Sequence, residues 1–193
     1  GKVNLRLYLC RMRLATIFFL TIMLVLQLLF SGCATEKGPD LMSLDLPHLA
    51  LEIGSYSMDL IKIKRQKAFE RGLLVSKGGD YVSARIAFAG DTISAQVRLK
   101  GDWLDHLRGD KWSFRIKLAD DACILGMNRF SIQHPKTRSY LDEWVYHKLA
   151  MEEGILTPKY EFVRVTLNGR EKGIYAIEQH FDRILLETQG RRE

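Results

Sequence analysis

The spacing of apolar side chains divides the chain into one long apolar run, several helices and several strands. Residues 14–30 are apolar or uncharged throughout. Further along, apolar positions recur either at helical spacing or in strict alternation, which indicates amphipathic helices and half-buried strands. The helical spacing predicts helices over residues 57–72, 139–153 and 181–188. The alternation predicts strands over residues 81–88, 93–100, 112–118, 129–133, 160–167 and 172–178.

Turn residues connect these elements in a definite order. Ala89–Thr92 lie between two strands of similar length, which predicts a hairpin. Asn168-Gly169 separates another pair, and this dipeptide supplies the positive φ that a tight type I′ turn requires. Ser57 can cap the first helix, and Gly72 fits just past its end. The order predicts an α+β fold, an antiparallel sheet with packed helices, after an N-terminal signal helix.

The N-terminal segment has the features of a secretory signal. Four basic residues and no acidic residue precede or accompany the apolar run, and Ser31-Gly32-Cys33 follows it. This resembles a bacterial lipobox, in which Cys33 is acylated and becomes the new N-terminus. An uncleaved membrane anchor is the alternative, because 17 residues are at the lower limit for a span. Both predictions place the chain in the cell envelope, exported and anchored to a membrane.

The predicted organisation is a lipoprotein signal peptide at 1–32, a tether at 33–56 and one domain at 57–193. The chain has 193 residues, 47% hydrophobic and 27% charged, which is typical of a folded globular protein. Four of its six net positive charges lie in the signal segment, which leaves +2 for the remainder. We therefore expect no nucleic-acid partner, and the predicted anchor makes a membrane the expected one. Cys123 is then the single cysteine of the domain, and its apolar neighbours predict a small buried side chain.

Three segments carry a resemblance to a known family, at residues 97–118, 126–147 and 160–182. They contain a Lys-Gly turn, Lys-x-Ser-Phe-Arg-Ile-Lys, Gly-x-x-Arg-Phe, an Arg before a helix, and Asn-Gly-x-x-x-Gly-x-Tyr-x-x-Glu. As an ordered set, these elements resemble the CotH kinase family, named for spore-coat protein H, and most closely its secreted bacterial branch.

The resemblance implies an atypical protein kinase that phosphorylates proteins outside the cytoplasm, using ATP and a divalent metal, Mg or Mn. It also implies that the fold resembles the N-lobe of an atypical protein kinase. The catalytic base and the metal-binding aspartates of such a kinase would follow Glu193, so we expect this chain alone to be inert. The chain begins with Gly1 rather than Met and ends without a natural stop, which suggests a fragment of a longer protein.

Phosphoryl transfer requires cations that neutralise phosphates, and kinases use a strand lysine held by a helix glutamate. Lys117 on the predicted strand 112–118 and Glu143 on the following helix match this pattern. Lys100 and Lys111 can also serve as the cation, and Glu152 can also serve as the acid. By resemblance, Glu178 would end the strand that leads to the hinge beside the nucleotide base.

No metal ligands are predicted within the chain. The polar residues of the loop after Gly101, Asp102, Asp105, His106 and Asp110, match no known ligand spacing and are better explained as a solvated loop. Because the bacterial envelope holds little ATP, a second function remains open. It is a non-catalytic envelope lipoprotein whose CotH-like scaffold binds a protein or a polymer.

Overall fold

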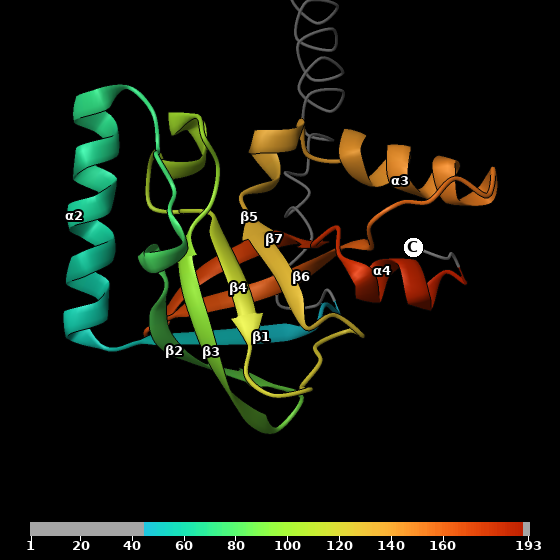
Figure 1. The fold of residues 1–193 in the computed structure, drawn as a ribbon, viewed down its shortest axis with the longest axis horizontal. Coiled ribbons are helices and arrows are strands. Elements are labelled where there is room, and N and C mark those ends of the chain that lie inside the picture. The colour runs from blue at the N-terminus through green and yellow to red at the C-terminus, as the bar shows by residue number, and fades with distance from the viewer. Residues whose placement is uncertain (1–44, 191–193) are drawn as a thin grey trace, which may run out of the picture. The chain divides into compact units, whose positions relative to one another are not determined.

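Seven β-strands close into a barrel with the strand order β1-β2-β3-β4-β5-β7-β6 (Figure 1). The computed structural model describes residues 45–190. The predicted signal peptide, Cys33 and the first part of the tether lie outside these residues. The strands are β1 (His48–Ile53), β2 (Val82–Phe88), β3 (Asp91–Leu99), β4 (Phe114–Leu118), β5 (Arg129–Gln133), β6 (Tyr160–Leu167) and β7 (Arg170–Gln179).

The barrel is closed by β1, which pairs antiparallel with β2 and parallel with β6. In this register Leu49 lies opposite Phe88 on one side and Val165 on the other. Leu49 and Leu51 are fully buried, so β1 contributes every second side chain to the core. A segment that the sequence pattern places in the tether is therefore an integral strand.

The predicted α+β fold, a kinase N-lobe with packed helices, is wrong. The sheet closes on itself, and its apolar core lies mainly inside the barrel, with Ile61 and Ala68 of the first helix packed against it. The error arises because β1 is short and lies about 30 residues before its first partner, so local alternation gives no sign of the pairing that closes the sheet.

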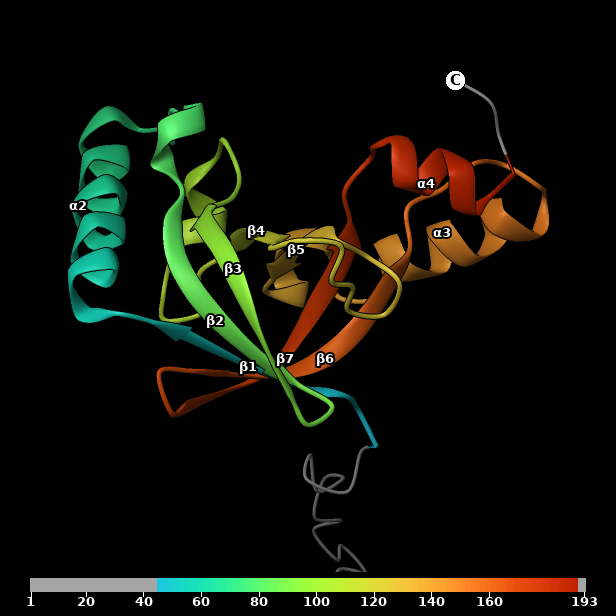
Figure 2. The same ribbon diagram turned by 60° about the horizontal axis from the view of Figure 1, so that its bottom comes forward.

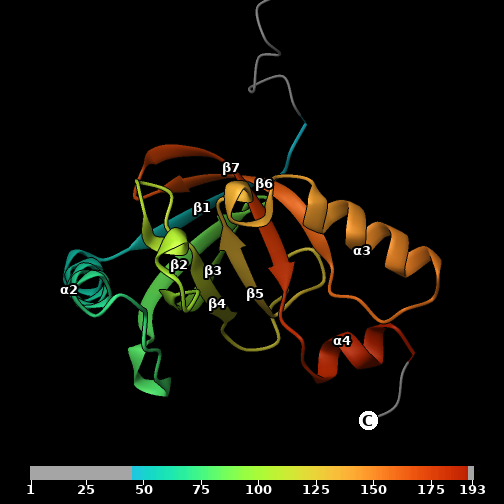
Figure 3. The ribbon, with the colours of Figure 1, turned by 90° about the horizontal axis from the view of Figure 1, so that it is seen from above.

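Three α-helices of residues 45–190 lie outside the barrel: α2 (Ser55–Arg71), α3 (Asp142–Glu152) and α4 (Arg183–Thr188). Figure 2 and Figure 3 show α2 on one side of the barrel and α3 with α4 on the opposite side. α2 contacts β2 and β3, and α3 contacts β6. Within residues 45–190, no helix is long and apolar enough to cross a bilayer.

The individual elements agree with their predictions, except that Gly54 rather than Ser57 caps the first helix. Each predicted helix and each predicted strand forms, with its bounds moved by no more than three residues. Both hairpins form, and Asn168 and Gly169 have φ values of 49° and 74°. Cys123 is a correction, because its side chain is exposed. The neighbouring Ile124 is the residue of this loop that turns into the core.

Strand pairing also arranges the outer surface of the barrel. Val97, Ile116 and Phe130 lie in register and are fully buried inside. The alternate residues therefore face outward, and the register aligns Arg98, Arg115, Ser131 and Glu178 across β3, β4, β5 and β7. This outer face brings together polar and charged residues from four strands.

Candidate functional site

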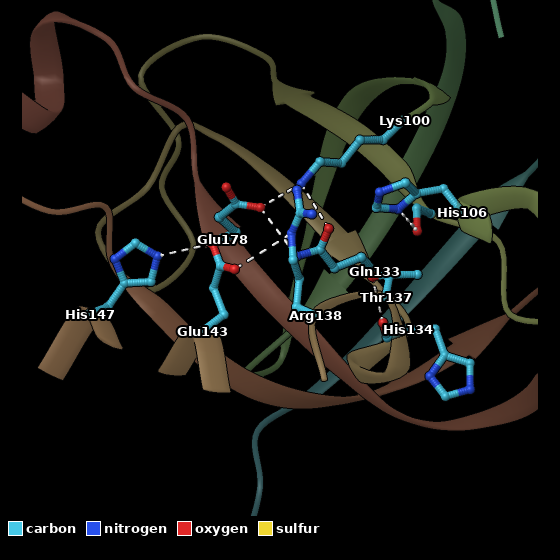
Figure 4. A network of polar contacts seen from close by, with 10 residues as sticks. Lys100, His106, Gln133, His134, Thr137, Arg138, Glu143, His147 and Glu178 are labelled. Atoms are coloured by element: carbon cyan, nitrogen blue, oxygen red, sulfur yellow. Dashed lines mark hydrogen bonds and ion pairs between the residues drawn. The ribbon is translucent and has the colours of Figure 1, made fainter. Parts of the chain in front are cut away.

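Lys100 lies at the end of β3, on the same outer face as Arg98. Its backbone N–H donates to the carbonyl of Ser113 at 2.9 Å, which extends the β3–β4 pairing by one step. Its side chain is only 9% exposed. The Nζ atom donates to Oε1 of Gln133 at 2.8 Å and forms an ion pair with the carboxylate of Glu178 (Figure 4).

Two neighbouring strands, β5 and β7, hold this cation in place. Gln133 ends β5 and donates through Nε2 to Oε2 of Glu178 at 3.2 Å, so the acid is bound by both partners. Burial lowers the pKa of Lys100, and the nearby Glu178 carboxylate opposes that effect. A buried charge of this kind persists only where partners replace its lost hydration. The structure therefore fixes an ammonium group at one point of the outer face.

A second group of charges adjoins the first. Arg138 ends a short 3-10 helix (Pro135–Arg138), and its Nε lies 3.6 Å from Oε2 of Glu143 on α3. His147, one turn further along α3, places Nε2 3.5 Å from Oε1 of the same glutamate. Figure 4 shows the Arg138 guanidinium between Glu143 and the Lys100–Glu178 pair, and its charge contributes to the lowered pKa of Lys100.

Gly101 allows the chain to turn immediately after Lys100. Its φ is +96°, and a Cβ atom there would lie 2.6 Å from Cγ of His106. His106 is itself buried, and its Nδ1 lies 2.9 Å from Oγ of Ser113. The glycine of the predicted Lys-Gly turn is thus required by close packing as well as by backbone conformation.

Two connected cavities lie over this face. One, of about 340 Å³, adjoins Lys100 and Gly101, and the other, of about 300 Å³, extends toward Lys117. They share Ser76, Arg98 and Arg115. The cations around the second cavity are Lys77, Arg98, Arg115, Lys117 and Arg129, and no acidic residue of the described chain lines it.

An uncompensated cluster of cations is suited to an anionic ligand. Within residues 45–190, the Nε atom of Arg115 is buried and has no hydrogen-bond partner. Guanidinium groups bind phosphate and carboxylate oxygens through paired N–H donors. Arg115 and Arg98 lie directly opposite each other on β4 and β3. The second cavity can therefore accept a group with several negative oxygens.

Lys117 and Glu143, the first predicted pair, are not brought together. Lys117 projects from the outer face of β4, and its Nζ lies 4.2 Å from the ring centroid of Tyr81. It forms no ion pair with any acidic residue among residues 45–190. Glu143 instead contacts Arg138 and His147. Lys117 does line the second cavity, so it belongs to the same surface as Lys100.

Lys111 and Glu152, which the sequence also offers as cation and acid, lie away from this pair. Lys111 donates to the backbone carbonyl of Ile174 at 3.4 Å, beside Gly173 on β7, and burial lowers its pKa. Glu152 is exposed at the end of α3. Of the predicted residues, Lys100 and Glu178 are thus the two that the fold joins directly.

Sequence reasoning missed Gln133, Arg115 and Arg138 as parts of this site. Gln133 is fully buried at the end of β5, a strand in which two apolar residues alternate with polar residues, and the alternation places Gln133 on the outer face but does not reveal its burial. Arg115 alternates with Phe114 and Ile116, which indicates an outward position but not its neighbours. The sequence analysis identifies Arg138 only as a motif residue before a helix.

The described residues offer no metal site. Among residues 45–190, no three His, Cys, Asp or Glu side chains converge closely enough to hold an ion. His106 is turned toward Ser113, and Asp110 pairs with Lys172 at 3.3 Å. These residues therefore do not fit the divalent metal that the family resemblance implies, and no chemical step is assigned to it.

The second half of the chain matches a known protein family. The family model described as CotH kinase protein matches residues 97–193, which is half of the chain. The matched segment begins on β3 and includes Lys100, Gln133, Arg138 and Glu178. No curated protein matches the chain.

Proposed function

The chain belongs to the CotH kinase protein family, and we propose that it is the N-terminal portion of an exported, membrane-anchored protein kinase. The complete enzyme would transfer phosphate from ATP to Ser or Thr hydroxyls of proteins. The observation that supports this proposal is the buried Lys100–Glu178 pair beside two adjoining cavities, the second of which is lined by cations and by no acidic residue of the described chain. A fixed ammonium group next to a cationic cavity is what binding of a triphosphate requires.

ATP fits the chemistry of this face. When bound, it would supply the transferred phosphoryl group and a chain of negative oxygens. Lys100 would provide a positioned point charge, while Arg98 and Arg115 would provide planar donors for phosphate oxygens. The buried, unsatisfied Nε of Arg115 gains a partner in such a complex. The three residues lie on two adjacent strands of a rigid barrel, so binding requires little reorganisation.

Glu178 and Gln133 act through Lys100 in this proposal. Their oxygens receive the hydrogen bonds of its Nζ, which keep the ammonium charged and aimed at one place. Because burial alone favours the neutral amine, removing the carboxylate would weaken both the charge and its orientation. They are therefore positioning residues for the cation.

We expect the chain by itself to bind nucleotide without transferring phosphate. Among residues 45–190, no group of three His, Cys, Asp or Glu side chains is placed to hold a metal ion. Incubation with labelled ATP and casein should therefore leave the casein unlabelled. Labelling of casein by this chain would contradict the expectation that it binds nucleotide without transferring phosphate.

Nucleotide binding is tested by calorimetric titration of the full chain with ATP. Lys100→Met should lower the affinity by at least about 10-fold, because one charge-assisted contact is lost. Lys100→Met leaves the carboxylate of Glu178 without its cation. The double variant Lys100→Met/Glu178→Gln removes that carboxylate as well and should show the same loss of affinity. Lys62→Met is the matched control, since Lys62 pairs with Asp59 on the exposed surface of α2. Equal affinity of all four proteins would overturn the assignment.

Export and lipidation at Cys33 belong to the same proposal. Metabolic labelling with palmitate should label the wild-type chain and not Cys33→Ser. Label that persists in Cys33→Ser would exclude this cysteine as the acylated residue.

The cationic cavity supports a second function, an envelope lipoprotein that binds an anionic protein or polymer without catalysis. The absence of acidic residues around that cavity in the described chain is the observation that favours it. Titration with polyglutamate distinguishes the two functions. Binding of polyglutamate that ATP does not displace would favour the second.

A further inference from the structure

One face of α2 combines apolar and basic side chains in a single stripe. Tyr56, Leu60, Ile63, Lys67 and Arg71 recur at intervals of three and four, so they lie along the same side of the helix. All five are exposed, including 77% of Tyr56 and 52% of Ile63. Tyr56, Leu60 and Ile63 make the N-terminal half of the stripe apolar. Lys67 and Arg71 make its C-terminal half basic.

A groove of about 420 Å³ runs beside this stripe, between α2 and the segment at residues 73–77 that follows it. We call it the α2 groove. Leu74 and Ala68 are buried at its base, whereas Leu73 and Val75 are 45% and 40% exposed on its wall. Figure 1 shows α2 at the edge of the molecule, on the side away from α3 and α4.

The rim of the α2 groove carries net positive charge. Asp80 is the one acidic residue that lines it within the described chain, and Asp80 pairs with Lys64 at 2.9 Å. Lys67 and Arg71 form no ion pair with any acidic residue among residues 45–190. Two free cations therefore stand beside exposed aliphatic side chains.

We infer that the α2 groove docks on an anionic lipid bilayer. Lys67 and Arg71 reach the lipid phosphates, while Leu60, Ile63 and Leu73 enter the boundary between headgroups and acyl chains. This combination of exposed apolar side chains and basic residues is the one that interfacial membrane binding uses. The inference does not depend on nucleotide binding, because these five docking residues line neither of the cavities over the Lys100 face.

The position of the predicted anchor favours a bilayer over a soluble partner. Residues 34–47 would link an acylated Cys33 to β1, and 14 extended residues span at most about 50 Å. A domain held that close meets the membrane at a high effective concentration, so a weak basic and apolar surface suffices for docking. An acidic amphipathic peptide is the rival occupant, and the experiment includes it.

The test is hydrogen–deuterium exchange of the full chain on vesicles. Vesicles of phosphatidylglycerol with phosphatidylcholine are compared with vesicles of phosphatidylcholine alone. The N-terminal apolar segment is present in both, so exchange within residues 60–77 reports only the local docking. We expect slower exchange there with phosphatidylglycerol. Each basic side chain near an anionic surface is worth about a five-fold change in partition. Lys67→Ser should thus lower the added protection about five-fold and Lys67→Ser/Arg71→Ser about 25-fold.

Lys62→Ser is the matched control, because Lys62 lies on the same helix but is paired with Asp59. It should change the added protection less than about two-fold, because Lys62 does not line the α2 groove. Ile63→Ser tests the apolar half and should also reduce protection. Equal exchange on the two vesicle types would overturn the inference. Protection produced by an acidic amphipathic peptide in solution, and not by phosphatidylglycerol, would overturn it as well.

Discussion

Lys100 and Lys117 lie on the same outer face of the barrel, yet their surroundings differ. Lys100 is almost fully buried and bound by Gln133 and Glu178. Lys117 is half-buried, and its contact is with the ring of Tyr81. Both residues line connected cavities, and each directly follows an apolar strand residue.

The comparison shows that a strand lysine becomes a fixed charge only where neighbouring strands supply partners. At the Lys100 end, β5 and β7 bring an amide and a carboxylate to the required place. At the Lys117 end, the aligned residues are Gln96 and Arg129, so no acid is available. The alternation in sequence is the same at both ends, and the register makes the difference.

The largest expected effect comes from removing the acid at the Lys100 end. Glu178→Ala leaves a buried ammonium without its counter-charge and should lower the free energy of unfolding by about 3 kcal/mol. Urea unfolding measures it. The matched control is Glu161→Ala, which breaks the half-exposed Lys148–Glu161 pair and should cost about 0.5 kcal/mol. Equal losses would show that the Lys100 end is no more tightly held than the surface.

Alkaline pH should lower the stability of the protein through a buried tyrosine that lies opposite Glu178. Tyr160 lies opposite Glu178 and is buried, and burial raises the pKa of Tyr160 to about 12 from an ordinary 10.0. Between these values the folded protein binds the proton that the unfolded chain releases, so stability falls as pH rises. Relative to Tyr160→Phe, wild type should lose about 1 kcal/mol per pH unit from about pH 10 to 12. Urea midpoints that shift in parallel for the two proteins would contradict this.

Alanine variants of three glycines distinguish the stability cost of a steric clash from the stability cost of backbone strain. Gly101→Ala must accept both a positive φ and a clash with His106, and it should lose about 2 kcal/mol of stability. Gly90→Ala has a similar φ of +93° with open space around its Cβ, so about 1 kcal/mol is expected. Gly78→Ala has neither problem and should change stability by less than about 0.5 kcal/mol. Thermal unfolding of the three variants gives the order, and a reversed order would refute the role given to His106.

The smallest effect is expected at Lys117. Lys117→Met removes a contact with the face of Tyr81 that is partly open to solvent, and it should reduce stability by less than about 1 kcal/mol. Urea unfolding beside Glu178→Ala completes the comparison of the two ends. A loss at Lys117 as large as that at Glu178 would mean that this lysine, too, is structurally fixed.

Much of the fold could be predicted because the relevant signals are local. Alternation identifies β4 at Phe114–Leu118, and Asn168-Gly169 identifies the β6–β7 hairpin. β1 was missed because its partners are distant and its six residues adjoin the tether. Within the site, the sequence supplied Lys100 and Glu178 as separate candidates, but 78 residues separate them and no local pattern joins them.

The sequence by itself determined the three helices and every strand except β1, both hairpins and the family to which the chain belongs. These follow from backbone periodicity, turn conformation and an ordered set of short motifs. Only the tertiary structure decided that the sheet closes through β1 and that Lys100, rather than Lys117, is held by an acid. The reason is that pairing between distant strands sets which outward side chains become neighbours, and burial then decides which of them needs a partner.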